Sequence, residues 1–313
     1  MRKVIVAKAA GFCYGVQRAV DMALEARRSS DGKITSLGPI VHNNQVASKL
    51  LAEGVEAASD LGSIREGSVI LSAHGVPPST VKQAQSQGLR VLNVTCPFVT
   101  RVHRTACQLI DQGYQLLLLG EANHTEVRGI VGAVNGNVTV IGGVEELKSV
   151  RLSRKVGIVT QTTQKAEDFA AVVAEISKTV FDLRAFNTIC NATDELQQAA
   201  IEMAKQVEVA IVVGGKQSAN TARLRLICEE AGTPAYHVET AAEIEDSWIA
   251  EANTVGVTAG ASTPDWLIEE VVKRLNYGQL PSDFKIHHPD ESTMTKFFGS
   301  TANKGGKELA LAA

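Results

Sequence analysis

The sequence predicts an α/β protein of three small domains with mostly parallel sheets. Short aliphatic runs alternate with stretches of helical apolar spacing, and polar or glycine-containing turns separate them. The runs are apolar throughout, which is typical of parallel strands that helices bury on both faces. A cysteine recurs where a strand passes into a helix, at Cys13, Cys96 and Cys190, at intervals of about one small domain. We therefore expect three domains around a central site.

The elements and domain limits follow from these runs in chain order. Strands are predicted over residues 4–7, 68–73, 90–94, 116–120, 156–160, 209–214 and 254–259. Helical patterns follow most of them, which implies right-handed crossover connections. The cysteine units place the domains at residues 14–95, 96–189 and 190–281. Residues 282–313 are rich in Ser, Thr, Lys and Gly and predict a flexible C-terminal tail.

Composition excludes several classes of function. The 313 residues carry a formal net charge of −3, with 44 % hydrophobic and 21 % charged residues, as expected for a globular chain. No apolar run reaches the roughly 18 residues of a membrane span, and the N-terminal run is too short for a signal peptide. We therefore expect a cytoplasmic protein that does not enter a membrane. With only 4 % aromatic residues and no basic excess, nucleic acid is not an expected partner.

The cysteine positions favour a metal cofactor. A thiol at a helix N-terminus is expected to have a lowered pKa, and the carboxyl ends of parallel strands face a common crevice. Structural zinc uses four ligands, often in close pairs, and that spacing is absent from the sequence. Three separated thiolates instead suit an iron–sulfur cluster with one iron not held by cysteine, which can bind substrate as a Lewis acid. Burial in the core would explain any one of these cysteines, and is our interpretation of Cys107 and Cys228.

A second set of polar residues occupies the other predicted strand-to-helix turns. These are His42, His74, His124, Glu126, Thr162, Ser218, Asn220 and Ser262. Each alone could be an N-cap or an ordinary core histidine, but together they favour an anion site, most plausibly for phosphate. Neither a Walker A loop nor a dinucleotide fingerprint is present. Glu126 is the candidate acid, with a pKa raised by burial and like charge, although a glutamate complementing the helix dipole is an equal alternative.

The ordered motifs resemble one known family, the 4-hydroxy-3-methylbut-2-enyl diphosphate reductases of the non-mevalonate isoprenoid pathway. The motifs are AGFCYGVQRAV, GPIVHNNQV, SAHGV, NVTCPFV, NHTEVRG, TQTT, NTICNAT, GGKQSANT and GVTAGASTPDW, between residue 3 and about 275. The resemblance implies three α/β domains in a pseudo-threefold arrangement around a central 4Fe-4S cluster. It also implies that the strand within residues 1–13 joins the third domain.

The resemblance also implies roles for the residues already singled out. Cys13, Cys96 and Cys190 would hold three irons of one 4Fe-4S cluster. His42, His74, Ser218, Asn220 and Ser262 would bind the diphosphate, with His124 there or in the proton path. Glu126 and Thr162 would deliver protons, and Thr162 would also bind the substrate. The implied reaction is a reductive dehydroxylation that yields isopentenyl and dimethylallyl diphosphates and water. Reduced ferredoxin or flavodoxin would supply electrons one at a time.

The sequence departs from the family pattern at a few positions. Ala219 stands where many members have a second serine, Thr125 where proline is common, and Leu196 where arginine is usual. Two other functions remain open at this point. One is a three-cysteine iron–sulfur hydratase, dehydratase or condensing enzyme that acts as a Lewis acid on a small anionic substrate. The other is a non-catalytic iron–sulfur sensor.

Overall fold

Three four-stranded parallel sheets form the framework of the protein. The structure is a computed structural model of the chain and describes residues 3–277, so the predicted tail at 282–313 lies outside the described residues. The sheets have the strand orders β3-β2-β4-β5, β7-β6-β8-β9 and β11-β10-β12-β1. The strands are β1 Lys3–Val6, β2 Ile34–Leu37, β3 Val55–Ala58, β4 Ser68–Leu71, β5 Arg90–Asn93, β6 Gln115–Leu119, β7 Val138–Ile141, β8 Lys155–Thr160, β9 Asp182–Ala185, β10 Val209–Val213, β11 Ala235–Val238 and β12 Thr254–Ala259.

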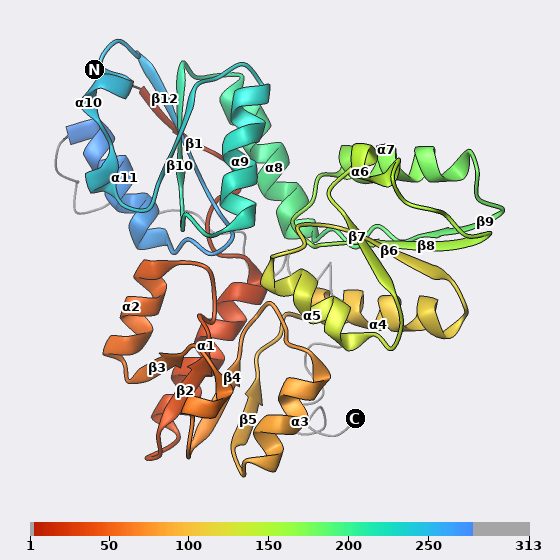
Figure 1. Ribbon diagram of the computed structural model, residues 1–313. Coiled ribbons are helices and arrows are strands. Elements are labelled where there is room, and N and C mark those ends of the chain that lie inside the picture. Colours follow the sequence, from red (N-terminus) through yellow and green to blue (C-terminus); the bar gives the residue numbers. More distant parts are fainter. Residues whose placement is uncertain (1–2, 278–313) are drawn as a thin grey trace, which may run out of the picture.

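The three sheets share one topology. In each, the second strand of the unit lies at one edge, followed by the first, third and fourth strands, and every pairing is parallel. The fourth position of the last sheet is taken by β1, whose Lys3 pairs with Thr254 and Val6 with Val257. The N-terminal strand thus completes the sheet built by residues 209–259. Figure 1 shows the three units as separate lobes that meet at the centre of the molecule.

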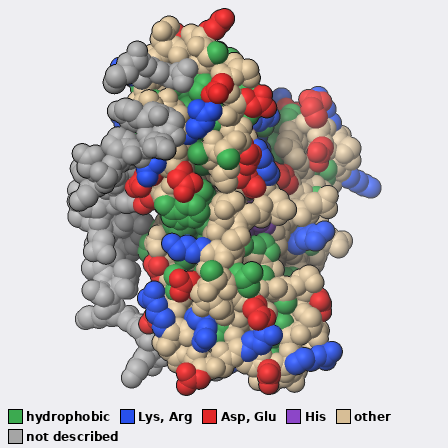
Figure 2. Space-filling model, turned by 90° about the vertical axis from the view of Figure 1, so that its left-hand side faces the viewer, with side chains coloured by type: hydrophobic (Ala, Val, Ile, Leu, Met, Phe, Trp, Pro, Cys, Tyr) green, Lys and Arg blue, Asp and Glu red, His purple; other side chains and the backbone are tan. Residues whose placement is uncertain are grey.

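Helices cover both faces of each sheet. They are α1 Tyr14–Arg28, α2 Asn44–Ala52, α3 Pro78–Ser86, α4 Pro97–Asp111, α5 Thr125–Ala133, α6 Val144–Leu147, α7 Ala166–Ser177, α8 Asn191–Ala204, α9 Ala219–Glu230, α10 Asp246–Ile249 and α11 Asp265–Tyr277. Among residues 3–277, no helix is long and apolar enough to cross a membrane. Acidic and basic side chains are interspersed over the face seen in Figure 2, in keeping with the small net charge.

Strand β6 shows how the sequence produces these layers. Leu116 and Leu118 pack with residues of α4 and α5, whereas Leu117 and Leu119 pack with residues of α6 and α7. All four side chains are fully buried. Successive side chains on a strand point to opposite faces, so an unbroken apolar run is what a doubly covered strand requires. Burial of each leucine contributes about 1.5–3 kcal/mol.

The structure confirms the predicted α/β class with parallel sheets. The seven predicted strands are present, with ends that differ by up to two residues. Strands β2, β3, β7, β9 and β11 were not among the predictions. The domain limits at 14–95, 96–189 and 190–281 stay a prediction.

Candidate active site

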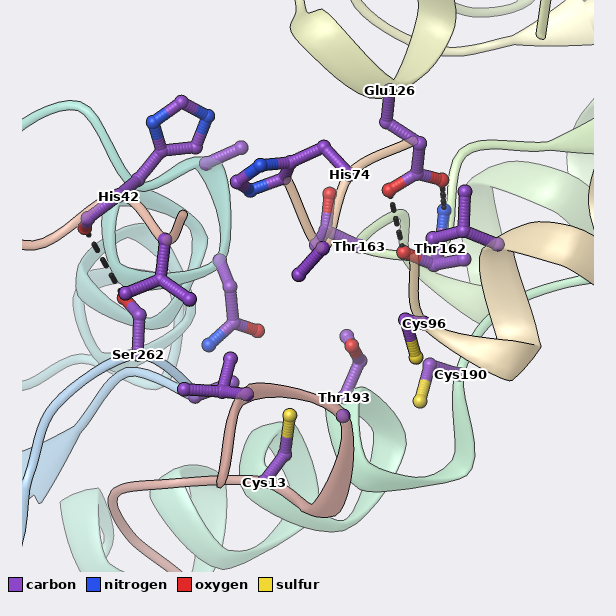
Figure 3. Close-up of a pocket in the computed structure, with 18 of the residues that line it drawn as sticks. Cys13, His42, His74, Cys96, Glu126, Thr162, Thr163, Cys190, Thr193 and Ser262 are labelled. Atoms are coloured by element: carbon purple, nitrogen blue, oxygen red, sulfur yellow. Dashed lines mark hydrogen bonds between the residues drawn. The ribbon is translucent and has the colours of Figure 1, made fainter. Parts of the chain in front are cut away.

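Each of the three cysteines follows the last strand of one sheet and directly precedes the first helix of the next lobe. Cys13 follows β1 and is the N-cap residue of α1, Cys96 follows β5 and caps α4, and Cys190 follows β9 and caps α8. Each therefore comes after the fourth strand of its sheet. All three line one pocket, where Figure 3 shows their sulfur atoms exposed to the same space. Cys107 and Cys228 do not line it.

The polar residues of the pocket follow the first and third strands of the three sheets. In the first sheet, His42 follows β2 and His74 follows β4. In the second, Glu126 follows β6 and Thr162 follows β8. In the third, Ser218 follows β10 and Ser262 follows β12. First and third strands are neighbours in every sheet, and their connections run in opposite directions, so a crevice opens at their carboxyl ends. All the residues predicted from the sequence to form the site line this pocket.

The buried carboxyl group of Glu126 makes two short contacts with Thr162. Glu126 is 2 % exposed and lies in the first turn of α5. Its Oε1 accepts a hydrogen bond from the Thr162 N–H at 2.7 Å, and its Oε2 lies 2.8 Å from Thr162 Oγ1 (Figure 3). Burial raises the pKa of the Glu126 carboxyl to about 7, although the hydrogen bonds from Thr162 oppose this shift. Near neutral pH this carboxyl can therefore both hold and release a proton.

Three imidazole rings lie together on another side of the pocket. The ring centroids of His42 and His74 are 4.1 Å apart, and that of His124 lies 5.6 Å and 5.9 Å from them. Burial lowers the pKa of all three, and repulsion between the rings adds to this shift for His42 and His74; the two effects together lower the pKa of His42 to about 4. The rings are therefore neutral at neutral pH.

Hydrogen bonds orient two of these rings. His124 Nδ1 accepts from the Glu126 N–H at 3.2 Å, so neutral His124 carries its proton on Nε2. His42 Nε2 lies 3.3 Å from Thr125 Oγ1. The buried Nδ1 atoms of His42 and His74 and both side-chain polar atoms of Asn220 have no partner among the described residues. Buried polar atoms without partners are costly, which indicates that a polar ligand satisfies them.

Ser218 and Ser262 add hydroxyl groups to the pocket. Ser218 caps α9, and its Oγ accepts from the Thr221 N–H at 3.3 Å, which leaves its hydroxyl proton available to a ligand. Ser262 Oγ donates to the His42 backbone carbonyl at 3.2 Å, between the third and first lobes (Figure 3). Sequence analysis missed Thr163 and Thr193, which also line the pocket. The sequence signals that could have identified them are that Thr163 directly follows Thr162 and that Thr193 lies one helical turn after Cys190.

The three thiols fit an iron–sulfur cluster. Backbone N–H groups at the starts of α1, α4 and α8 point at the sulfurs, but burial outweighs them and raises the pKa of Cys96 to about 11 and of Cys190 to about 12. The thiol pKa of Cys13 is also raised by burial. The lowered pKa expected from the helix N-termini is therefore wrong, because desolvation is the larger effect. Bound iron would reverse this, because a thiol that coordinates a metal is deprotonated and its proton is released to solvent.

Space at the sulfurs also matches such a group. A Cβ atom at Gly15 would lie 2.5 Å from Cys96 Sγ, so glycine keeps this approach open. Among residues 3–277, no group of three or more His, Cys, Asp or Glu side chains is arranged to hold one metal ion. An iron–sulfur cluster does not need three side chains around one ion, because each cysteine binds a different iron. Three separate thiols that face one open space therefore fit such a cluster.

Fold and site together define a three-lobed α/β enzyme with three cysteines and a set of carboxyl, imidazole, amide and hydroxyl side chains in one central pocket. The model of the family described as LytB protein matches residues 4–276. The chain belongs to this family, as its motifs predict.

Relatives in this family carry a consistent name. The chain is 46 % identical to a 4-hydroxy-3-methylbut-2-enyl diphosphate reductase of Trichlorobacter lovleyi, covering 88 % of this chain and 98 % of the relative. It is 44 % identical to the enzyme of that name in Aquifex aeolicus, covering 90 % and 100 %. A solved structure of the Plasmodium falciparum E-1-hydroxy-2-methyl-but-2-enyl-4-diphosphate reductase has a TM-score of 0.85 at 26 % identity, covering 92 % and 93 %. A solved (E)-4-hydroxy-3-methyl-but-2-enyl diphosphate reductase has a TM-score of 0.64 at 43 % identity, covering 88 % and 99 %.

Proposed function

We propose that this protein reduces 4-hydroxy-3-methylbut-2-enyl diphosphate to isopentenyl and dimethylallyl diphosphates, the last step of the non-mevalonate isoprenoid pathway. Its relatives are reductases of this substrate by name. The observation that carries the proposal is the convergence of the three thiols, the Glu126–Thr162 pair and the histidine and serine turns in one pocket. The reaction replaces a C–OH bond with a C–H bond, consumes two electrons and two protons, and releases water.

We propose that Cys13, Cys96 and Cys190 hold one 4Fe-4S cluster. Such a cluster, with one iron free of cysteine, would supply electrons and a Lewis acid for the substrate hydroxyl. The thiols of these residues stay reduced in the cytoplasm, which is the location we propose for the protein. Reduced ferredoxin or flavodoxin is the proposed electron donor, because no dinucleotide fingerprint is present.

The proposed diphosphate ligands are His42, His74, His124, Ser218, Asn220 and Ser262. The unpartnered Nδ1 atoms of His42 and His74 and the amide of Asn220 gain partners when a polar anion enters. The first turn of α9 adds backbone N–H groups and the positive end of its dipole. Ala219 supplies no hydroxyl at this turn, so binding here depends on Ser218 and the backbone.

Glu126 and Thr162 are proposed to move the proton. When Glu126 is protonated, its O–H donates across the 2.8 Å contact to Thr162 Oγ1, whose own proton is then available to the substrate hydroxyl. Neutral His124 offers its Nε2–H as a second donor, because its Nδ1 is engaged by the Glu126 N–H. The leaving hydroxyl thereby departs as water rather than hydroxide.

The experiment that tests the proposal follows electron consumption. The protein is reconstituted with iron and sulfide without oxygen, and oxidation of a dithionite-reduced viologen dye is recorded on adding 4-hydroxy-3-methylbut-2-enyl diphosphate. We expect substrate-dependent dye oxidation and formation of both products. A cluster-loaded protein that leaves the dye reduced would contradict the proposal, because a Lewis-acid hydratase needs no external reductant.

A further inference from the structure

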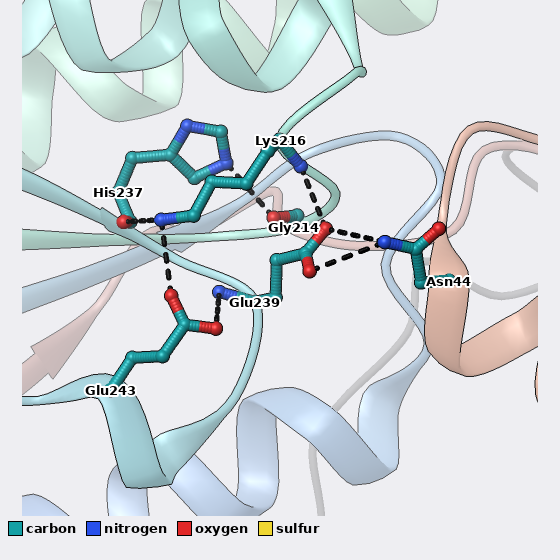
Figure 4. A network of polar contacts seen from close by, with 6 residues as sticks. All are labelled: Asn44, Gly214, Lys216, His237, Glu239 and Glu243. Atoms are coloured by element: carbon teal, nitrogen blue, oxygen red, sulfur yellow. Dashed lines mark hydrogen bonds and ion pairs between the residues drawn. The ribbon is translucent and has the colours of Figure 1, made fainter.

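A polar network lies behind the turn that joins β10 to α9, on the side away from the pocket. It consists of Asn44, Gly214, Lys216, His237, Glu239 and Glu243 (Figure 4). None of these residues lines the pocket. The turn itself carries Ser218 and Asn220, which the proposed function assigns to diphosphate binding.

The end of β11 holds this turn at several atoms. His237 Nε2 donates to the Gly214 carbonyl at 2.8 Å, because a carbonyl oxygen can only accept. The half-buried Glu239 accepts the Lys216 N–H on Oε1 at 2.9 Å. Lys216 Nζ donates to the His237 carbonyl and pairs with Glu243 Oε2 at 3.1 Å. The lysine of the GGK sequence is therefore engaged on this side of the turn rather than in the pocket.

The same carboxylate reaches across to the first lobe. Asn44 Nδ2 donates to Glu239 Oε1 and Oε2 at 3.2 Å and 3.3 Å, from the first residue of α2. Asn44 lies two residues after His42, whose backbone carbonyl packs so closely on Gly215 that a Cβ there would approach it to 2.3 Å. Glu239 thus connects the serine–asparagine turn to the segment that carries His42.

We propose that Glu239 is a positioning residue for diphosphate binding, acting through Lys216 and Asn44. This inference rests on the proposed function. One carboxylate binds both a backbone N–H of the turn and the start of α2, so it holds the proposed ligands of the two lobes in a fixed position relative to each other. Replacing the charged acceptor by an amide weakens both hydrogen bonds, because charge-assisted hydrogen bonds are about twice as strong as neutral ones.

The test measures binding of inorganic diphosphate to the cluster-loaded protein by calorimetry, together with kcat and KM for the substrate. We expect Glu239→Gln to raise the Kd and the KM about tenfold while kcat changes less than twofold. Asn44→Ala should raise the Kd about threefold. The double variant should bind no more weakly than Glu239→Gln alone, because both changes weaken the same contact between residues 44 and 239. Glu239→Asp should recover part of the affinity, and the exposed neighbour Glu245→Gln is the matched control.

Three results would overturn the inference. An unchanged Kd in Glu239→Gln, a loss confined to kcat, or additive effects in the double variant would each show that Glu239 does not position the ligands. If the unmodified protein neither binds diphosphate nor turns over substrate, the proposed function itself fails. These outcomes are distinguishable because the first three require an active parent protein.

Discussion

At the scale of single residues, the surroundings of Glu126 determine its proton chemistry. Burial favours the neutral acid, and only the contacts from Thr162 favour the carboxylate. An acid with a pKa of about 7 is matched to proton delivery at neutral pH. The same residue in solvent would be ionised and would have no proton to give.

Glu126→Gln is therefore expected to abolish most of the turnover and to leave the cluster in place. Loss of a general acid costs about 10²–10⁴-fold in rate. The variant is assayed by dye oxidation, and its visible absorption shows whether the cluster is retained. Glu121→Gln, an exposed substitution in the same turn, is the control. Unchanged turnover would remove Glu126 from this role.

The raised pKa also predicts two pH dependences. Because the acid must be protonated, kcat/KM should fall as pH rises through about 7. The folded state binds this proton more tightly than the unfolded state, so the stabilisation is complete below the ordinary pKa of 4.5 and is lost as pH rises to about 7. The histidines of lowered pKa act in the opposite sense over this range, so the test is the difference in unfolding free energy between the parent protein and Glu126→Gln. The parent should lose stability relative to Glu126→Gln as pH rises from 4.5 to about 7, and a pH-independent difference would contradict the raised pKa.

Single cysteine substitutions separate the proposed ligands from the remaining thiols. Cys190→Ala is expected to lose the cluster, because its thiol lines the pocket, whereas Cys107→Ala should retain it. The Cys107 sulfur is instead 3.4 Å from the Ala133 carbonyl. Iron content and visible absorption after reconstitution measure the difference. Equal iron in both variants would show that the three-cysteine assignment is wrong.

At the scale of elements, the start of α1 must fit closely against Cys96. Gly15 leaves space where a Cβ would come within 2.5 Å of the Cys96 sulfur, and a sulfur bound to iron cannot move aside freely. Gly15→Ala is therefore expected to reduce cluster incorporation severalfold, even though alanine is the better helix former by about 1 kcal/mol. Gln17→Ala, at an exposed position of the same helix, is the control for iron content. Full incorporation in Gly15→Ala would show that α1 can shift.

The elements also show what the sequence could and could not predict. Strands with unbroken apolar runs, such as β6 and β10, were predictable because both faces are covered. Four of the missed strands, β3, β7, β9 and β11, lie at sheet edges, where fewer apolar residues are needed. The fifth, β2, carries the buried Thr35 and Ser36, and Ser36 Oγ is satisfied by the Gly38 carbonyl. The hydrogen bond that allows Ser36 to be buried could not be predicted from the sequence.

For the site, position along the strands was predictable but the electrostatics were not. Cysteines and polar turns could be assigned to strand ends, so eleven of the residues that line the pocket were predicted, although Thr163 and Thr193 were missed. The direction of the thiol pKa shift depends on burial that only tertiary structure creates. The contact of Asn44 with Glu239 spans 195 residues and has no local signature.

At the scale of the whole molecule, three histidines that can titrate lie where the first and second lobes meet. His42 and His74 come from the first sheet and His124 follows the first strand of the second. Their lowered pKa values mean that the folded state binds these protons less tightly than the unfolded state. The stabilisation is thus complete above the ordinary pKa of 6.5 and is lost as pH falls towards about 4.

A diphosphate in the pocket should reverse this effect, because an anion favours the charged imidazolium. We therefore expect binding of inorganic diphosphate at pH 6 to take up protons, measured by calorimetry in two buffers of different ionisation enthalpy. Free diphosphate also exchanges protons, so the informative quantity is the difference between the parent protein and His42→Asn, which should take up fewer. His103→Gln is the matched control, because burial also lowers the pKa of His103 but its side chain does not line the pocket. Equal uptake in the parent and His42→Asn would mean that the diphosphate leaves His42 neutral, and its role would then be limited to neutral hydrogen bonding.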